Sequence, residues 1–146
     1  MSLYYPVQQV STLVGSKSGT TLTSVALTDA YDVANKTKVI ECGGFSKINF
    51  DILYTMGATE TSNSIELRVE GSPDGTNFYR IANESVSGGT STLTRREFTY
   101  VGADAVAATI SIGLDIFYKY LKVSVKETGK VTNFGTVYVE CTLSGS

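Results

Sequence analysis

The side chains that could perform chemistry in this 146-residue chain are carboxylates, tyrosines, lysines and two cysteines, because the chain has no histidine. Without histidine, Ser-His-Asp and Cys-His catalysis and histidine metal sites are impossible. A catalytic pair of carboxylates would have to come from strand-like segments, whose acidic residues are Asp51, Glu66, Glu70, Glu97 and Glu140. Most of these alternate with Lys or Arg on the polar face of their segment. We interpret them as cross-strand ion pairs on a solvated sheet face and expect neither an enzyme nor a cofactor.

Asp74 lies in the segment Ser72-Pro73-Asp74-Gly75-Thr76-Asn77, between two runs of alternating residues. Pro73 presets φ for the first central position of a turn, and Gly75 tolerates positive φ. Asp74 can then accept hydrogen bonds from the nearby backbone. The EF-hand spacing is absent, so we interpret Pro73, Asp74 and Gly75 as a turn and a fold marker. A calcium site built with Asp51 or Asp115 is the alternative.

The two cysteines, Cys42 and Cys141, lie far apart in the sequence and lack CxxC spacing. Each falls in a strand-like run, and Cys141 shares parity with Val137, Val139 and Leu143. We expect two buried free thiols that behave as small hydrophobic side chains. A single disulfide between them is the alternative.

The nine tyrosines are spread along the chain. Tyr118 and Tyr120 share one face of a strand-like segment, and Tyr138 is expected to point outward. Such residues either pack in an oligomer interface or stack on sugar rings, and we favour the interface. The predicted interface residues are Tyr4, Tyr5, Val7, Tyr118, Tyr120 and Tyr138. For sugar binding the candidates are Tyr79, Tyr118 and Tyr138, but the chain has no Trp.

The segments that would carry these residues are short and alternate in polarity. In residues 46–55, Ile48, Phe50, Ile52 and Tyr54 share one face, and residues 65–71 and 136–144 repeat the pattern. No segment has sustained helical periodicity. We therefore predict an all-β fold, an antiparallel β-sandwich or jelly roll of eight to nine strands, in residues 21–146. Residues 1–20 are predicted to form an extended N-terminal arm.

The charge pattern indicates which partners to expect. The chain has 12 basic and 14 acidic residues and no run of like charge. Nucleic-acid binding needs a basic surface, so none is expected. The chain has no polybasic segment and no apolar run of about 20 residues, so we expect no contact with a membrane. The N-terminal sequence also lacks the features of a secretory signal.

Three strings resemble small β-sandwich virion proteins of tailed bacteriophages: "IELRVEGSPDGTNFYRIANES", "LDIFYKYLKVSVKETG" and "GTVYVECTLS". The resemblance covers residues 38–143. It implies a capsid decoration protein or a head- or tail-associated protein, assembled in the bacterial cytoplasm and located in the virion. It also implies a homo-oligomer, with a trimer favoured, whose partners are its own copies and a capsid or other virion protein.

A similar hairpin motif occurs in discoidin-like carbohydrate-binding domains. Those usually carry more Trp and a Cys pair near their termini, whereas Cys42 lies well inside this sequence. A carbohydrate-binding module, assisted by calcium, is therefore the alternative function.

Overall fold

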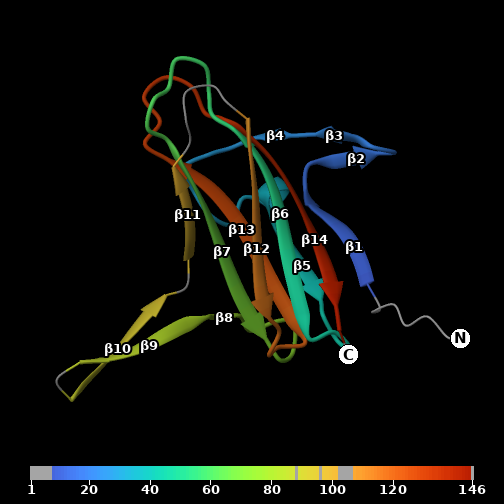
Figure 1. Ribbon diagram of the computed structural model, residues 1–146, viewed down its shortest axis with the longest axis vertical. Coiled ribbons are helices and arrows are strands. Elements are labelled where there is room, and N and C mark those ends of the chain that lie inside the picture. The colour runs from blue at the N-terminus through green and yellow to red at the C-terminus, as the bar shows by residue number, and fades with distance from the viewer. Residues whose placement is uncertain (1–7, 88, 96, 102–106, 146) are drawn as a thin grey trace, which may run out of the picture.

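The alternating segments of the sequence form two antiparallel sheets that face one another (Figure 1). The computed structural model describes residues 8–87, 89–95, 97–101 and 107–145, and in its strands between residues 82 and 101 it describes the backbone. Sheet I contains β1 (Gln8–Val14), β4 (Val25–Ala26), β6 (Lys47–Thr55), β12 (Ala107–Asp115) and β14 (Thr136–Ser144). Its strand order is β1-β14-β6-β12, and β4 also pairs with β14.

Sheet II lies behind sheet I and has the order β11-β7-β13-β5, with β8 also paired to β7. Its strands are β5 (Thr37–Glu41), β7 (Ser64–Ser72), β8 (Tyr79–Arg80), β11 (Glu97–Val101) and β13 (Tyr120–Thr128). The remaining elements are two hairpins and one turn of 3₁₀ helix: β2 (Ser16–Ser18) with β3 (Thr21–Thr23), β9 (Ala82–Ser87) with β10 (Thr90–Arg95), and η1 (Ala34–Lys36).

The core lies between the two sheets and is built from the residues that the alternation placed inward. Phe50 and Tyr54 of β6 are fully buried, as are Val123 and Val125 of β13 and Val139 of β14. Each inward aliphatic or aromatic side chain contributes about 1.5–3 kcal/mol by leaving water. The predicted all-β antiparallel sandwich is confirmed.

The described residues contain fourteen strands, more than the eight or nine predicted. The additional strands are the short elements β2, β3, β4 and β8 and the hairpin β9–β10. Strands β2, β3, β4 and β8 have only two or three residues each, too few for the alternation to separate them as strands of their own.

The first part of the chain differs from the predicted arm of residues 1–20. Residues 1–7, with Tyr4, Tyr5 and Val7, lie outside the described residues. Gln8–Val14 is strand β1, which pairs with β14 from Gln8 opposite Ser144 to Val14 opposite Val139. Leu13 and Val14 are buried in the core. This part of the predicted arm is therefore an edge strand of sheet I.

The β9–β10 hairpin is an insertion into a strand that would otherwise be continuous. In β8, Arg80 lies opposite Glu70 of β7, and in β11, Glu97 lies opposite Arg68 of β7. Both short strands therefore run along the same edge of β7, with one position of β7, Val69, between them. The chain leaves the sheet at this point, and Figure 1 shows β9 and β10 extending away from the sandwich.

Candidate functional site

The turn at Ser72–Asn77 uses its own polar side chains to satisfy Asp74. Oδ1 of Asp74 accepts hydrogen bonds from the Thr76 N–H at 2.9 Å, the Asn77 N–H at 2.8 Å and the Ser72 hydroxyl at 2.9 Å. Its Oδ2 accepts one from the Asn77 side-chain amide at 2.9 Å. These donors, led by the Asn77 N–H, hold the pKa of Asp74 well below its usual range. The carboxylate is thus engaged by its own turn.

We expect Asp74→Ala to lower the midpoint of thermal unfolding by a few degrees, because the N–H groups of Thr76 and Asn77 lose their acceptor. No binding or assembly activity should be lost. Thermal unfolding followed by circular dichroism measures the first effect. A variant that unfolds at the wild-type temperature would show that the carboxylate does not stabilise the turn.

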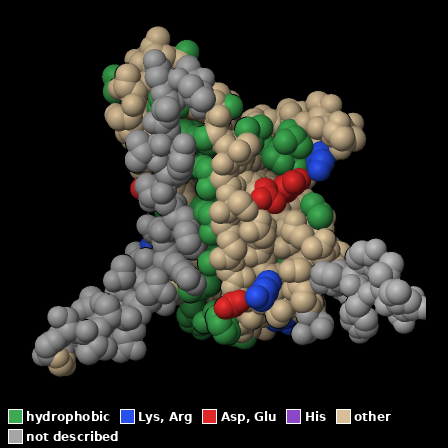
Figure 2. Space-filling model, in the orientation of Figure 1, with side chains coloured by type: hydrophobic (Ala, Val, Ile, Leu, Met, Phe, Trp, Pro, Cys, Tyr) green, Lys and Arg blue, Asp and Glu red, His purple; other side chains and the backbone are tan. Residues whose placement is uncertain are grey.

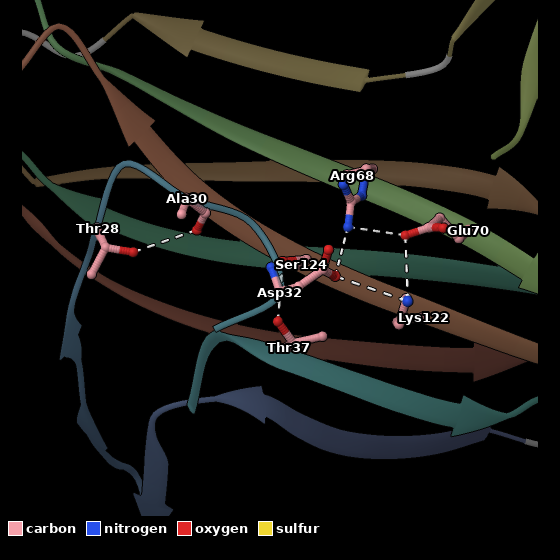
Figure 3. Close-up of polar contacts among 8 residues, drawn as sticks. All are labelled: Thr28, Ala30, Asp32, Thr37, Arg68, Glu70, Lys122 and Ser124. Atoms are coloured by element: carbon pink, nitrogen blue, oxygen red, sulfur yellow. Dashed lines mark hydrogen bonds and ion pairs between the residues drawn. The ribbon is translucent and has the colours of Figure 1, made fainter. Parts of the chain in front are cut away.

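A charged network covers the outer face of sheet II (Figure 3). The guanidinium of Arg68 on β7 contacts the Asp32 carboxylate at 2.6 Å and the Glu70 carboxylate at 3.0 Å. The ammonium of Lys122 on β13 lies 3.9 Å from Asp32 and 3.7 Å from Glu70. Two cations and two anions thus alternate in one cluster, and each carboxylate contacts both cations.

The loop before β5 covers the Arg68 and Glu70 side chains of this network. Its Tyr31 ring lies over the Arg68 guanidinium, 4.4 Å from the ring centroid. Asp32 has a positive φ of 64°, and its N–H donates to the Ser124 hydroxyl at 2.9 Å. The side chain of Arg68 is only 6% exposed and that of Glu70 only 11%. The prediction of a solvated polar face is therefore wrong at these two residues, although the ion pairing of Glu66 with Lys126, at 3.4 Å, fits it.

The network predicts a dependence of stability on pH. The hydrogen bond from Arg68 lowers the pKa of Asp32 against the opposing effect of burial. Because the folded-state pKa is the lower one, this stabilisation is complete above about pH 4 and is lost as the pH falls through the folded-state value. In Asp32→Asn, stability should fall less between pH 5 and pH 2 than in the wild type. Urea unfolding at several pH values measures the free energy of unfolding of both proteins. If this free energy falls equally in both between pH 5 and pH 2, the prediction is contradicted.

The outer face of sheet I carries the second polar cluster. Ser111 of β12, Asp51 of β6 and Glu140 of β14 lie opposite one another in consecutive strands. The Asp51 carboxylate accepts hydrogen bonds from the Asn49 amide at 3.0 Å and the Ser111 hydroxyl at 3.1 Å. Glu140 pairs with Lys17 of β2 at 3.4 Å. Glu140 thus forms an ion pair, as predicted, whereas the partners of Asp51 are an amide and a hydroxyl rather than a cation.

Tyr138 is covered rather than exposed. It points to the outer face of sheet I, as its parity predicted, but it is only 2% exposed. Its hydroxyl lies 3.0 Å from the Thr12 hydroxyl and donates to Glu140 at 2.9 Å. Gly15, which precedes the β2–β3 hairpin, packs against its ring. A pocket of about 310 Å³ opens beside it, lined by residues that include Leu22, Asp51 and Ser111.

The predicted interface residues Tyr118 and Tyr120 and the sugar-binding candidate Tyr79 lie near the end of β7, where Tyr79 is opposite Gly71 and Tyr120 is opposite Ser72. Tyr118 precedes β13 and is half-buried against the core, where its ring lies directly over Gly71. Tyr120 is half-buried on β13 beside Gly75. Tyr79 on β8 is exposed. Tyr118 and Tyr138 thus serve the packing of this chain, and the described tyrosines do not form one exposed surface.

Two buried carboxylates were missed by the sequence interpretation. Glu127 follows Leu121, Val123 and Val125 on the inward face of β13, a parity that could have identified it. It accepts hydrogen bonds from the Tyr54 hydroxyl and, at 2.9 Å, from the Gly135 N–H.

Glu60 is the second of these carboxylates, and it joins two loops at one end of the sandwich. It accepts hydrogen bonds from the N–H groups of Val131, Thr132 and Asn133 at 3.0, 2.6 and 2.7 Å. Both acids hold loops in place.

The cysteines are buried and free, as predicted, and the disulfide alternative is wrong in this structure. Burial raises the pKa of both thiols to about 11. Thiolate is the reactive form, so neither Cys42 nor Cys141 has the character of a nucleophile.

Among the residues that the structure describes, no three Asp, Glu or Cys side chains lie close enough together to hold a metal ion. In the same part of the chain, no helix has the length and hydropathy needed to cross a bilayer.

The chain matches no family model and no curated protein. Among solved structures it is similar to the SPBc2 prophage-derived protein YomS, with 12% identity, a TM-score of 0.44 and 99% of both chains covered. It is also similar to dimeric latent PorU from Porphyromonas gingivalis, with 8% identity and a TM-score of 0.47. That alignment covers 98% of this chain and 13% of PorU. Because both TM-scores are below 0.5, neither structure bears on what this chain does.

Proposed function

We propose that this chain is a non-enzymatic structural protein of a phage virion, and that it decorates the capsid or serves as a head–tail accessory. The observation that carries the proposal is the β9–β10 hairpin. In the chain, the hairpin lies between β8 and β11. These two short strands pair with the same edge of β7 in one continuous register. The sandwich therefore does not need the hairpin, which instead provides a surface for contacts outside the sandwich.

A hairpin of this kind is expected to bind a partner. Among the described strands, β9 and β10 pair only with each other. A two-stranded hairpin is at best marginally stable in water, so packing against another surface would stabilise it. A neighbouring subunit or a capsid protein would supply that surface.

The three strings that resemble phage virion proteins support the location in a virion. The apolar residues Tyr4, Tyr5 and Val7 would add a second contact, exchanged between copies of a trimer or docked on the capsid. Each such side chain contributes about 1.5–3 kcal/mol when buried. Many copies on one particle would multiply weak contacts into stable attachment.

The arrangement of polar groups supports a non-enzymatic role. Asp51, Asp74 and Glu140 are each engaged by hydrogen bonds or an ion pair within the chain. The sugar-binding alternative requires a platform of several exposed aromatic rings, but of its three candidates Tyr138 is buried, Tyr118 packs on Gly71, and Tyr79 is the one that is exposed. We expect no signal on a glycan array, with or without calcium. Specific binding there would favour the alternative.

Mass spectrometry of purified phage particles from a strain that carries this gene tests the proposal. We expect the protein to copurify with intact particles through a density gradient. Its absence from particles, in cells that express it, would overturn the virion role.

A further inference from the structure

We propose that strand β12 is a self-association surface, on which β12 of a second copy pairs antiparallel to join the two copies of sheet I. This inference rests on the proposed assembly role and deepens it, because it names the partner and the contact. β12 is the last strand of sheet I and pairs only with β6 among the described strands. Its outer edge of backbone N–H and C=O groups is therefore open to another strand.

The other edge strands carry features that hinder pairing, whereas β12 carries only one of them, the charge of its last residue, Asp115. β1 has an irregular register between Thr12 and Val14. β5 and β11 have five residues each, and β5 carries the exposed charges Lys38 and Glu41. β12 has nine residues, runs opposite β6 without a register shift, and has no Lys, Arg or Pro. Charges, bulges and short length are the usual protections against edge pairing.

The residues of β12 suit a second copy of the same strand. Ile110, Ile112 and Leu114 face the core but stay only half-buried at this open side of the sandwich. Figure 2 shows a narrow band of hydrophobic side chains down this side of the molecule, close to the line of β12 in Figure 1. The outward side chains of Thr109 and Ser111 are small and uncharged, and Gly113 has none.

Pairing over all nine residues of an antiparallel contact places Ser111 opposite Ser111 of the second copy. In this register Thr109 lies opposite Gly113, and Ile110 lies opposite Ile112, so the two apolar rows continue each other. The only charged residue of β12, Asp115, lies opposite Ala107 and meets no like charge. The edge is about 30 Å long at 3.4 Å per residue.

Paired charge variants test the contact. Thr109→Lys with Gly113→Lys places lysines opposite each other across the two-fold axis, whereas Thr109→Lys with Gly113→Glu places opposite charges there. Gly113 has ordinary φ, and an added Cβ would lie 3.5 Å from the Asn49 side chain, so the single chain accommodates these changes. Val10→Lys, on the exposed part of β1, is the matched control.

Light scattering coupled to size exclusion should give the double-lysine variant half the molar mass of the wild type. The Lys/Glu variant and Val10→Lys should keep the wild-type mass. An unchanged mass in the double-lysine variant, or a halved mass in both double variants, would overturn the contact. If the double-lysine variant fails to fold, Ser111→Cys tests the contact instead. A short thiol cross-linker should then give a covalent dimer. A lack of covalent dimer would contradict the contact. The virion role is tested by association with particles, and the β12 contact is tested by molar mass in solution. Failure of one proposal can therefore be distinguished from failure of the other.

Discussion

Deletion of residues 82–96 is expected to leave the sandwich folded and to abolish association with particles. The deletion joins Ile81 directly to Glu97. Because Arg80 lies opposite Glu70 and Glu97 lies opposite Arg68, Ile81 would take the position opposite Val69. The two short strands then become one continuous strand along β7 with its register preserved. We expect a thermal midpoint close to that of the wild type and a loss of at least tenfold in the protein recovered with particles.

Asp74→Ala is the matched control for this deletion. It should lower stability without lowering the amount of protein on particles, the reverse of the deletion. Circular dichroism and quantitative mass spectrometry of gradient-purified particles measure the two properties. If the deletion variant associates with particles as the wild type does, the hairpin is not the contact. If it fails to fold, the hairpin belongs to the sandwich and the insertion model is wrong.

Arg68→Met is expected to destabilise the protein by about 3 kcal/mol, the cost of removing one partner from a buried ion pair. The substitution keeps much of the side-chain volume but removes the cation that contacts both Asp32 and Glu70. Glu70, which is largely buried, then loses its 3.0 Å ion pair with Arg68 and keeps the longer one with Lys122, at 3.7 Å. The stacking of the guanidinium on Tyr31 is lost as well. Urea unfolding at pH 7 measures the free energy of unfolding.

Lys122→Met is the control in the same network. Its ion pairs are longer, at 3.7 and 3.9 Å, and its side chain is more exposed than that of Arg68. Ion pairs near the surface contribute less than about 1 kcal/mol. Equal losses in the two variants would mean that burial by the loop before β5 does not set the strength of these contacts.

The sheets could be predicted from sequence because their inward rows are regular. Phe50 and Tyr54 of β6, and Val139 and Cys141 of β14, alternate with polar neighbours, and strand periodicity depends only on such local order. The turn at Asp74 was predictable for the same reason, since its acceptor and donors lie within a few residues.

Side-chain burial on the outer faces could not be predicted in this way. Arg68 and Glu70 have outward parity, but a loop from another part of the chain covers them. Tyr138 is outward by parity, and the chain around the β2–β3 hairpin buries it. The insertion at residues 82–96 can be recognised only from the register in which β8 and β11 pair with β7. These features depend on tertiary contacts between segments distant in sequence.

Reconstitution on particles that lack this protein tests the central claim most directly. Purified chain would be added to particles from a host in which the gene is deleted, and bound copies would be counted by quantitative mass spectrometry. The proposed virion role predicts saturable binding at a fixed number of copies per particle. Binding that is absent, or that rises with concentration without saturating, would contradict it.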